Sequence, residues 1–405
     1  MCILCETPLS MESLKPAAEL PNARTEWPLL HVSFILIGVI TTFLGPILPF
    51  FSRHWSLTDA QSGFFFATQY FGSFLGVILT GWLLPRFGFS KVNALGFLAF
   101  LVGFAVLGLG PWWLAAILVA ISGFGYGLAN PAINLRATQL PSANTAAAVT
   151  LLNFSWSIGA VLCPYLVGLL VPRIGVFGMS SLIAAAALVL SLMHLSLGAK
   201  QPAVVKAPTA HSLAQWLGNL RHPAAIPLMA LFFFYVGTEV AFGGWVATHE
   251  RRLFSLPASA VSIAPSVFYG SLLFGRGVAP LLLRRVSELY ISAGGLFCAT
   301  IGGLTLATAH TPATLFVGTA MAGFGLAPQY PILVTWLAAI YRKDAEWMGV
   351  PFFCAAGLGG SAIPWMVGIV AAQSHSLRHG LYVPLIVCAA MFLLAFRAYP
   401  KRIAP

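Results

Sequence analysis

Two charged side chains stand inside long apolar stretches of the sequence. Glu239 lies in the stretch 223–248, and Arg276 lies in the stretch 261–283. A charge at the centre of a lipid bilayer costs about 2.5–3.5 kcal/mol on insertion scales, so such a residue needs a function or a partner. Two interpretations are open. Either Glu239 is a coupling carboxylate that binds and releases a cation while Arg276 binds a substrate or that carboxylate, or the two form a structural ion pair.

Uncharged polar and aromatic residues recur in the same kind of stretch. Amide groups can hydrogen-bond to a bound molecule, and a Trp or Tyr ring can cover an apolar face of it. Hydrogen bonds between helices explain any single residue equally well, at about 0.6 kcal/mol each. The candidate binding residues are Gln69, Tyr126, Asn130, Asn153, Trp156, Trp245, Tyr269, Gln329 and Tyr330.

The composition indicates where these residues must lie. Of 405 residues, 59% are hydrophobic and 8% are charged, whereas an ordinary soluble domain has about 25% charged residues. A water-soluble fold is therefore excluded. Apolar stretches run for 18 or more residues without the alternation of a membrane barrel, so the predicted class is an all-α membrane protein with twelve transmembrane helices. The predicted spans are 29–52, 60–84, 92–109, 112–135, 144–171, 176–197, 223–248, 261–283, 287–308, 312–340, 346–371 and 378–396.

Several other functional classes lack the residues that they need. The net charge of +11 is spread singly or in pairs between apolar runs, so nucleic acid is not an expected partner. The sequence has no H-E-x-x-H, no P-loop and no Ser/His/Asp set in context, and its Cys2-x-x-Cys5 is followed by no zinc-like pair. We expect no enzymatic activity, metal or resident cofactor.

The basic residues also predict an orientation. With the amino terminus inside, fifteen of the 21 Lys and Arg residues face the cytoplasm, five face outward, and Arg276 lies within a span. Cytoplasmic loops are rich in Lys and Arg, so both termini are expected in the cytoplasm, with no cleaved signal and a bacterial inner membrane as the location. The predicted layout is a tail 1–28, a bundle 29–197, a linker 198–222, a bundle 223–397 and a tail 398–405, the linker carrying a surface helix at 213–220.

The two halves repeat each other at an offset of about 200 residues. Gly123, Gly125 and Pro131 recur as Gly323, Gly325 and Pro331, while Gly159 and Pro164 recur as Gly359 and Pro364. Two pseudo-symmetric six-helix bundles are what an alternating-access transporter requires, because rocking one half against the other exposes a central site to each side in turn.

The segment G-W-L-L-P-R-F-G-F-S-K, residues 81–91, resembles the loop motif of the major facilitator superfamily. The resemblance implies that Arg86 and Lys91 hold the inner gate, although Pro85 stands where the family has an acid. Asn130-Pro131, L-L-N-F-S-W-S-I-G-A (151–160), Y-V-G-T-E-V-A-F-G-G-W (235–245) and F-G-R-G-V-A-P-L-L-L-R-R (274–285) are similar to the fucose and glucose permease branch of sugar:cation symporters. Two acids of fucose permeases are replaced by Gly45 and Tyr126, which leaves Glu239 to serve coupling.

This resemblance implies import of a small neutral, hexose-like sugar, coupled to H+ or Na+, by a monomer in the lipid bilayer. The candidate binding set fits a sugar, which offers many hydroxyls and one apolar ring face. The alternative is an exporter of an amphiphilic, drug-like or lipid-like compound, favoured by the 31 Phe and 11 Trp residues.

Overall fold

The computed structural model describes residues 23–140, 145–198, 221–256, 262–342 and 345–400, and these residues form helices and no strand. The first half contains α1 (Ala23–Thr42), α2 (Leu44–Trp55), α3 (Asp59–Ala105), α4 (Trp112–Gln139) and α5 (Thr145–Gly198). The second half contains α7 (Ala225–Leu253), α8 (Ala264–Leu282), α9 (Glu288–Ala307), α10 (Pro312–Leu326), α11 (Gln329–Tyr341), α12 (Ala345–Ser374) and α13 (Leu377–Ala398). The predicted surface helix in the linker lies outside the described residues.

Twelve membrane crossings follow from these helices, as predicted. α3 and α5 each contain two crossings, because the backbone reverses at Gly88 (φ 75°) and Gly175 (φ 73°), in the left-handed region that glycine tolerates. α1 with α2, and α10 with α11, each form one crossing with a break in the middle. The observed helix ends lie within a few residues of the predicted spans, the largest difference being that α1 begins at Ala23 rather than at 29.

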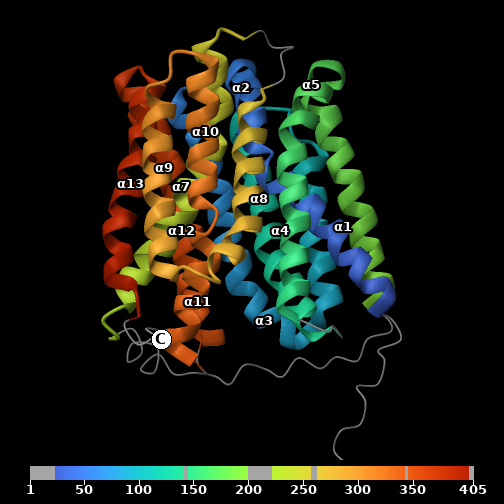
Figure 1. Ribbon diagram of the computed structural model, residues 1–405. Coiled ribbons are helices and arrows are strands. Elements are labelled where there is room, and N and C mark those ends of the chain that lie inside the picture. The colour runs from blue at the N-terminus through green and yellow to red at the C-terminus, as the bar shows by residue number, and fades with distance from the viewer. Residues whose placement is uncertain (1–22, 141–144, 199–220, 257–261, 343–344, 401–405) are drawn as a thin grey trace, which may run out of the picture.

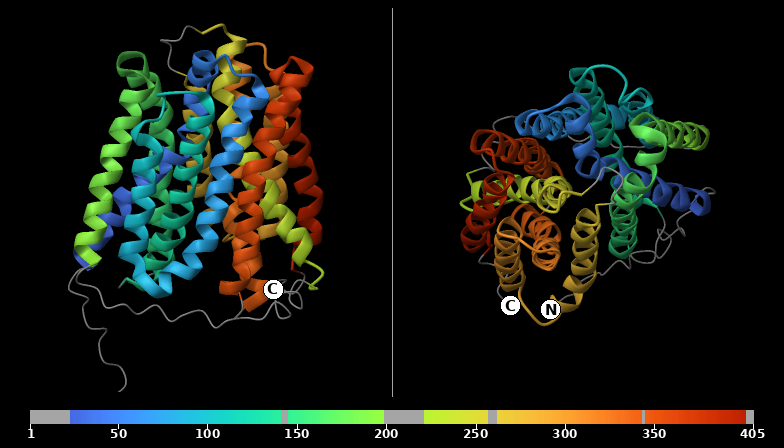
Figure 2. Two further views of the ribbon diagram at one scale, coloured as in Figure 1. Left: turned by 180° about the vertical axis from the view of Figure 1, so that it is seen from behind. Right: turned by 90° about the horizontal axis from the view of Figure 1, so that it is seen from above.

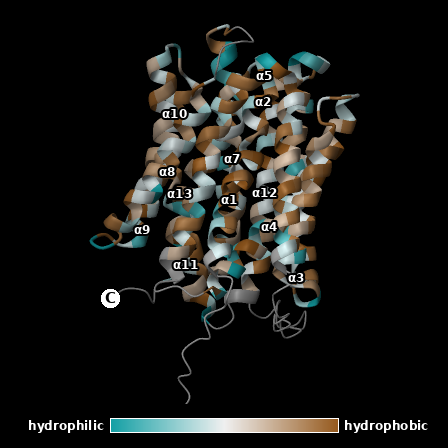
Figure 3. Ribbon diagram, turned by 90° about the vertical axis from the view of Figure 1, so that its right-hand side faces the viewer, coloured by the Kyte–Doolittle hydropathy of each residue, from teal (hydrophilic) through white to brown (hydrophobic). Residues whose placement is uncertain are grey.

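Nine continuous helical stretches of the described chain are long and apolar enough to span a membrane, and α8, which carries Arg276, is not among them. Hydrophobic residues predominate along the helices in the body of the molecule (Figure 3). Phe274, Ile386 and Leu393 are about two-thirds exposed. Such side chains are stable against lipid tails, not against water.

The two halves lie side by side, blue to green on one side of Figure 1 and yellow to red on the other. α1 begins and α13 ends on the same side of the molecule, as the view from behind also shows (Figure 2). We call this side the terminal side and the other the distal side.

Packing confirms the internal repeat. A Cβ built on Gly123 in α4 would lie 1.8 Å from the carbonyl oxygen of Gln69, and one on Gly323 in α10 would lie 2.4 Å from that of Phe268. Residues 69 and 268 are themselves 199 apart. Equivalent helix pairs therefore touch at equivalent glycines in both halves, where small residues let the backbones approach closely.

Contacts between the halves are concentrated toward the distal side. The distal part of α3 packs on α12, where Ser361 Oγ donates to the carbonyl of Ala67 at 2.9 Å. On α2, Gly45 packs against the backbone of Gly243 and Gly244 in α7. These contacts bring the two halves close together on that side.

Candidate functional site

A small cavity lies between the two halves, next to the break between α1 and α2. Its lining comes from α1, α2, α3 and α5 of the first half and from α7 and α8 of the second. The lining residues are Thr41, Thr42, Gly45, Phe66, Tyr70, Trp156, Glu239, Val240, Gly244 and Tyr269. Helices from both halves thus contribute to one site, as a substrate site of an alternating-access transporter requires.

Glu239 and Arg276, the two charges predicted inside spans, meet at this cavity. Arg276 Nη2 lies 3.4 Å from Glu239 Oε2, and their side chains are 25% and 14% exposed. The hydroxyl of Tyr235, one helical turn before Glu239, also donates to Glu239 Oε2. One carboxylate oxygen is thus occupied by the protein itself, while the residue still lines the cavity.

Trp156 connects this charged group to the first half. Its indole Nε1 donates to Thr41 Oγ1 at 3.1 Å, within the first half. Its ring lies below the Arg276 guanidinium at 5.5 Å and packs edge-on against Tyr269, both from α8. A cation over a Trp face is attracted by the ring quadrupole, so this contact crosses between the halves.

Among the other predicted residues, Tyr269 lines the cavity and the tyrosines Tyr126 and Tyr330 lie around it. Tyr330 packs against Tyr235 with ring centroids 6.1 Å apart. Tyr126 of α4 is an electrostatic neighbour of Tyr330, Glu239 and Arg276. The cavity lining itself has aromatic rings from both halves, Phe66, Tyr70 and Trp156 from the first and Tyr269 from the second.

The asparagines form a separate chain toward the terminal side. Asn153 Nδ2 of α5 donates to Asn134 Oδ1 at 3.2 Å, and Asn134 Nδ2 donates to Asn130 Oδ1 at 3.3 Å in α4. Asn153 is exposed and Asn130 partly buried. They do not line the cavity in this conformation.

Three candidates have buried side chains that are not among the cavity lining. Trp245 is fully buried, and its Nε1 donates to the Pro364 carbonyl at 2.9 Å. Gln329 accepts from Ser292 Oγ at 2.8 Å and donates to the Ser292 carbonyl at 3.0 Å, so it joins α11 to α9. Gln69 is 5% exposed, and its Oε1 has no hydrogen-bond partner among the residues that the structure describes.

Sequence reasoning did not select seven of the ten residues that line the cavity, nor Tyr235, which contacts its ion pair. The seven are Thr41, Thr42, Gly45, Phe66, Tyr70, Val240 and Gly244. A signal existed for Tyr235, because a residue four positions before Glu239 lies on the same face of a helix. No sequence signal marked the two threonines, because a threonine side chain in a helix commonly hydrogen-bonds to the backbone of its own helix. Thr42 does so here, since its Oγ1 donates to the Gly38 carbonyl at 2.8 Å.

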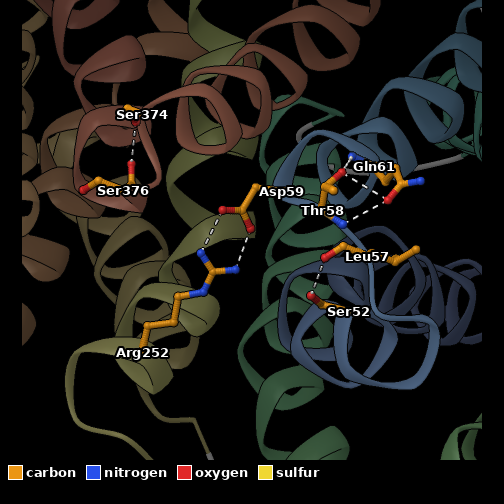
Figure 4. A network of polar contacts seen from close by, with 8 residues as sticks. All are labelled: Ser52, Leu57, Thr58, Asp59, Gln61, Arg252, Ser374 and Ser376. Carbon is orange, nitrogen blue, oxygen red and sulfur yellow. Dashed lines mark hydrogen bonds and ion pairs between the residues drawn. The ribbon is translucent and has the colours of Figure 1, made fainter.

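The predicted inner gate residues, Arg86 and Lys91, make no ion pair with the second half among the described residues. Arg86 Nη1 donates to the Trp82 carbonyl at 3.1 Å and its guanidinium lies 3.9 Å above the Trp82 ring, while Lys91 is exposed. On the distal side, Arg252 of α7 and Asp59 of α3 form a bidentate ion pair across the halves (Figure 4).

No group of three or more His, Cys, Asp or Glu side chains gathers in the described part of the chain.

Comparison with known proteins places this geometry in a family. The Major Facilitator Superfamily model matches residues 30–350. The chain is 24% identical to the human "Sodium-dependent glucose transporter 1" over 404 residues, covering 88% of this chain and 76% of that protein. It is 25% identical to the "Gallate transporter" of Pseudomonas putida over 446 residues, covering 95% and 96% of the two chains.

The fold resembles the crystal structure of the E. coli fucose:proton symporter, with a TM-score of 0.64, 18% identity, and coverage of 94% of this chain and 100% of that one. The resemblance to fucose and glucose permeases thus extends through the whole fold. Family and structural relatives are transporters and not enzymes. The chain is an integral membrane protein, and it belongs to the Major Facilitator Superfamily.

Proposed function

We propose that this transporter moves a small neutral, hexose-like sugar by alternating access, coupled to H+ or Na+ through Glu239. The observation that carries the proposal is the cavity between the halves, which combines a carboxylate with four aromatic rings, those of Phe66, Tyr70, Trp156 and Tyr269. Relatives named for glucose and fucose support the same substrate class.

The chemistry of the lining suits a sugar. The Glu239 carboxylate and the hydroxyls of Thr41 and Thr42 offer acceptors and donors for sugar hydroxyls, and the rings of Trp156 and Tyr269 offer an apolar face. We assign direct contact to these residues together with Tyr126 and Tyr330. We assign Trp245, Gln329 and Gln69 to the framework that holds the helices, and the asparagine chain to the path toward the terminal side.

Coupling rests on the pair of Glu239 and Arg276. When Glu239 binds a cation, Arg276 loses its partner charge and becomes available to the substrate, beside the Trp156 ring that it already faces. Ion binding and substrate binding then act on the same guanidinium. Each therefore changes the binding free energy of the other, which is the coupling that the proposal requires.

The transport cycle needs a gate on each side. We assign the distal gate to the close contacts of α2 with α7 and of α3 with α12, and the inner gate to Arg86 and Lys91, which would engage when the terminal side closes. From the charge bias of the loops we further propose that both termini lie in the cytoplasm, that the membrane is a bacterial inner membrane, and that the monomer is the working unit.

An alternative is export of an amphiphilic compound. The aromatic wall of the cavity favours it, because such rings also suit an aromatic or lipid-like molecule, and a relative is named for gallate.

Uptake of labelled sugars into proteoliposomes tests the proposal. We expect accumulation of a hexose above equilibrium when a proton or a sodium gradient is imposed, and only equilibration without a gradient. Glu239→Gln serves as the coupling-deficient reference. Transport of amphiphiles but of no sugar would support the alternative.

A further inference from the structure

Tyr235 is placed to act on the coupling carboxylate. It lies one helical turn before Glu239 in α7, with no proline between the two positions, so both side chains project from the same face. The Tyr235 ring is 1% exposed and is packed against Tyr330. Its hydroxyl donates to Glu239 Oε2. A buried ring with one fixed hydroxyl is well suited to orient a neighbouring group.

The same hydroxyl also meets Arg276. Arg276 Nη2 lies 3.3 Å from the Tyr235 hydroxyl and 3.4 Å from Glu239 Oε2. Charge-assisted bonds between nitrogen and oxygen are usually about 2.7–2.9 Å long. The arginine is therefore a loose partner of the carboxylate, to which the tyrosine hydroxyl also donates.

The two partners differ in what they can do when Glu239 takes up a proton. A guanidinium only donates hydrogen bonds, so it can bind the ionised carboxylate. It cannot accept a hydrogen bond from the proton of the carboxylic acid. A phenol can donate or accept. Tyr235 can therefore donate to the carboxylate and accept from the carboxylic acid.

We propose that Tyr235 is a positioning residue of the coupling site, which holds Glu239 in one orientation in both protonation states and favours its ionised form. This inference rests on the proposed coupling role of Glu239.

The other titratable or charged groups around Glu239 come from four helices that surround it. They are Arg276 and Tyr269 from α8, Tyr70 from α3, Tyr126 from α4 and Tyr330 from α11. Among the described residues, Tyr235 and Arg276 are those that hydrogen-bond to the Glu239 carboxylate. Removal of the Tyr235 hydroxyl leaves Arg276 as the one donor in that set.

The test is Tyr235→Phe, which keeps the buried ring and removes only the hydroxyl. Protonation of Glu239 is followed in reconstituted protein by infrared difference titration of the carboxyl C=O band, identified by its loss in Glu239→Gln. Loss of a donor to the ionised form should move the midpoint upward by about one pH unit, a tenfold gain in proton affinity. Tyr290→Phe, on a ring that is 69% exposed and lies in the first turn of α9, is the control and should leave the midpoint unchanged.

The titration uses protons alone, so it does not depend on the substrate. An unchanged midpoint in Tyr235→Phe overturns the positioning role, as does a Glu239 band that is absent from both proteins across the pH range. A shifted midpoint in a protein that carries no sugar supports the role of Tyr235 and overturns the proposed substrate. In a protein that does carry sugar, the pH profile of accumulation should shift with the titration.

Discussion

Arg252 and Asp59 tie the second half of the chain to the first on the distal side, with nitrogen to oxygen distances of 2.9 and 2.5 Å. Asp59 is the first residue of α3 and lies between Thr58 and Gln61, which form the capping box of this helix. Arg252 lies in the last turn of α7. An acid at a helix N-terminus and a base at a C-terminus are each stabilised by their own helix dipole. Both charges therefore keep a favourable environment when the halves separate, which suits a contact that must open in every cycle.

Neutralising this pair should shift the protein toward the conformation that is open on the distal side. Arg252 is 45% exposed, so the pair contributes about 0.2–1 kcal/mol, and Arg252→Gln should raise the open population by up to about fivefold. Distances between spin labels at the distal ends of α3 and α7 measure this population.

Arg173→Gln is the matched control, because Arg173 bonds only within its own helix, to the Leu169 carbonyl, in the described structure. Exchanging the two charges, Asp59→Arg with Arg252→Asp, should recover part of the closed population. Equal distances in all four proteins would remove the pair from the distal gate.

The glycines have the same spacing in the two halves for a steric reason, and the cost of replacing them can be measured. In Gly123→Ala the added Cβ would lie 1.8 Å from the Gln69 carbonyl oxygen, a contact that forces α4 away from α3. Overpacking of this kind costs about 1–3 kcal/mol. We expect a lower melting temperature of the protein in detergent, and a smaller decrease for Gly323→Ala, where the distance is 2.4 Å.

Gly270→Ala provides the control, since nothing lies within 4 Å of a Cβ at that position. The substitution should leave the melting temperature unchanged or raise it slightly, because alanine has the higher helix propensity. An equal decrease for Gly123→Ala and Gly270→Ala would contradict the packing argument.

The helices could be predicted from sequence because each requires only a long apolar stretch between polar ends, as with 112–135 against the observed α4 (Trp112–Gln139). The repeat could be predicted because glycine is required wherever two backbones touch. Which polar side chains face the cavity could not be predicted. Trp156 and Trp245 are both tryptophans inside long apolar stretches of the sequence. Yet Trp245 is fully buried and donates to the Pro364 carbonyl, whereas Trp156 lines the cavity. That difference is set by helix rotation and by the approach of helices distant in sequence.

The two tryptophans should therefore respond differently to truncation. Trp156→Ala removes an aromatic wall of the cavity, and we expect substrate binding to weaken by about 0.5–1.5 kcal/mol, up to about tenfold. Trp245→Ala leaves a void in a fully buried place and should lower stability by about 3–5 kcal/mol. Ligand titration and thermal unfolding of each purified variant separate the two effects. Comparable loss of affinity in a stable Trp245→Ala would return Trp245 to the binding site.

The orientation in the membrane is testable at the carboxyl end. α1 begins and α13 ends on one side of the molecule (Figure 1), and the excess of Lys and Arg predicts that this side is cytoplasmic. A reporter that works only in the cytoplasm should be active when fused after Pro405. It should be inactive when fused at Gly110, in the distal connection between α3 and α4. The reverse pattern would invert the assignment of both gates.

The coupling role of Glu239 separates from a structural role in one substitution. Its counterpart in the first half, at the offset of 199, is the buried Ile40, so the carboxylate is not part of the repeated framework. Glu239→Gln keeps the shape and can still accept from Arg276 and Tyr235, but it fixes the neutral state. Exchange of labelled substrate across the membrane needs only binding and rocking, so it should persist in this variant. Accumulation against a gradient needs an ion that binds and leaves, so it should fall to equilibration. Measured in the same proteoliposomes, a Gln variant that concentrates substrate as well as the parent would show that Glu239 and Arg276 are only an ion pair that joins α7 to α8.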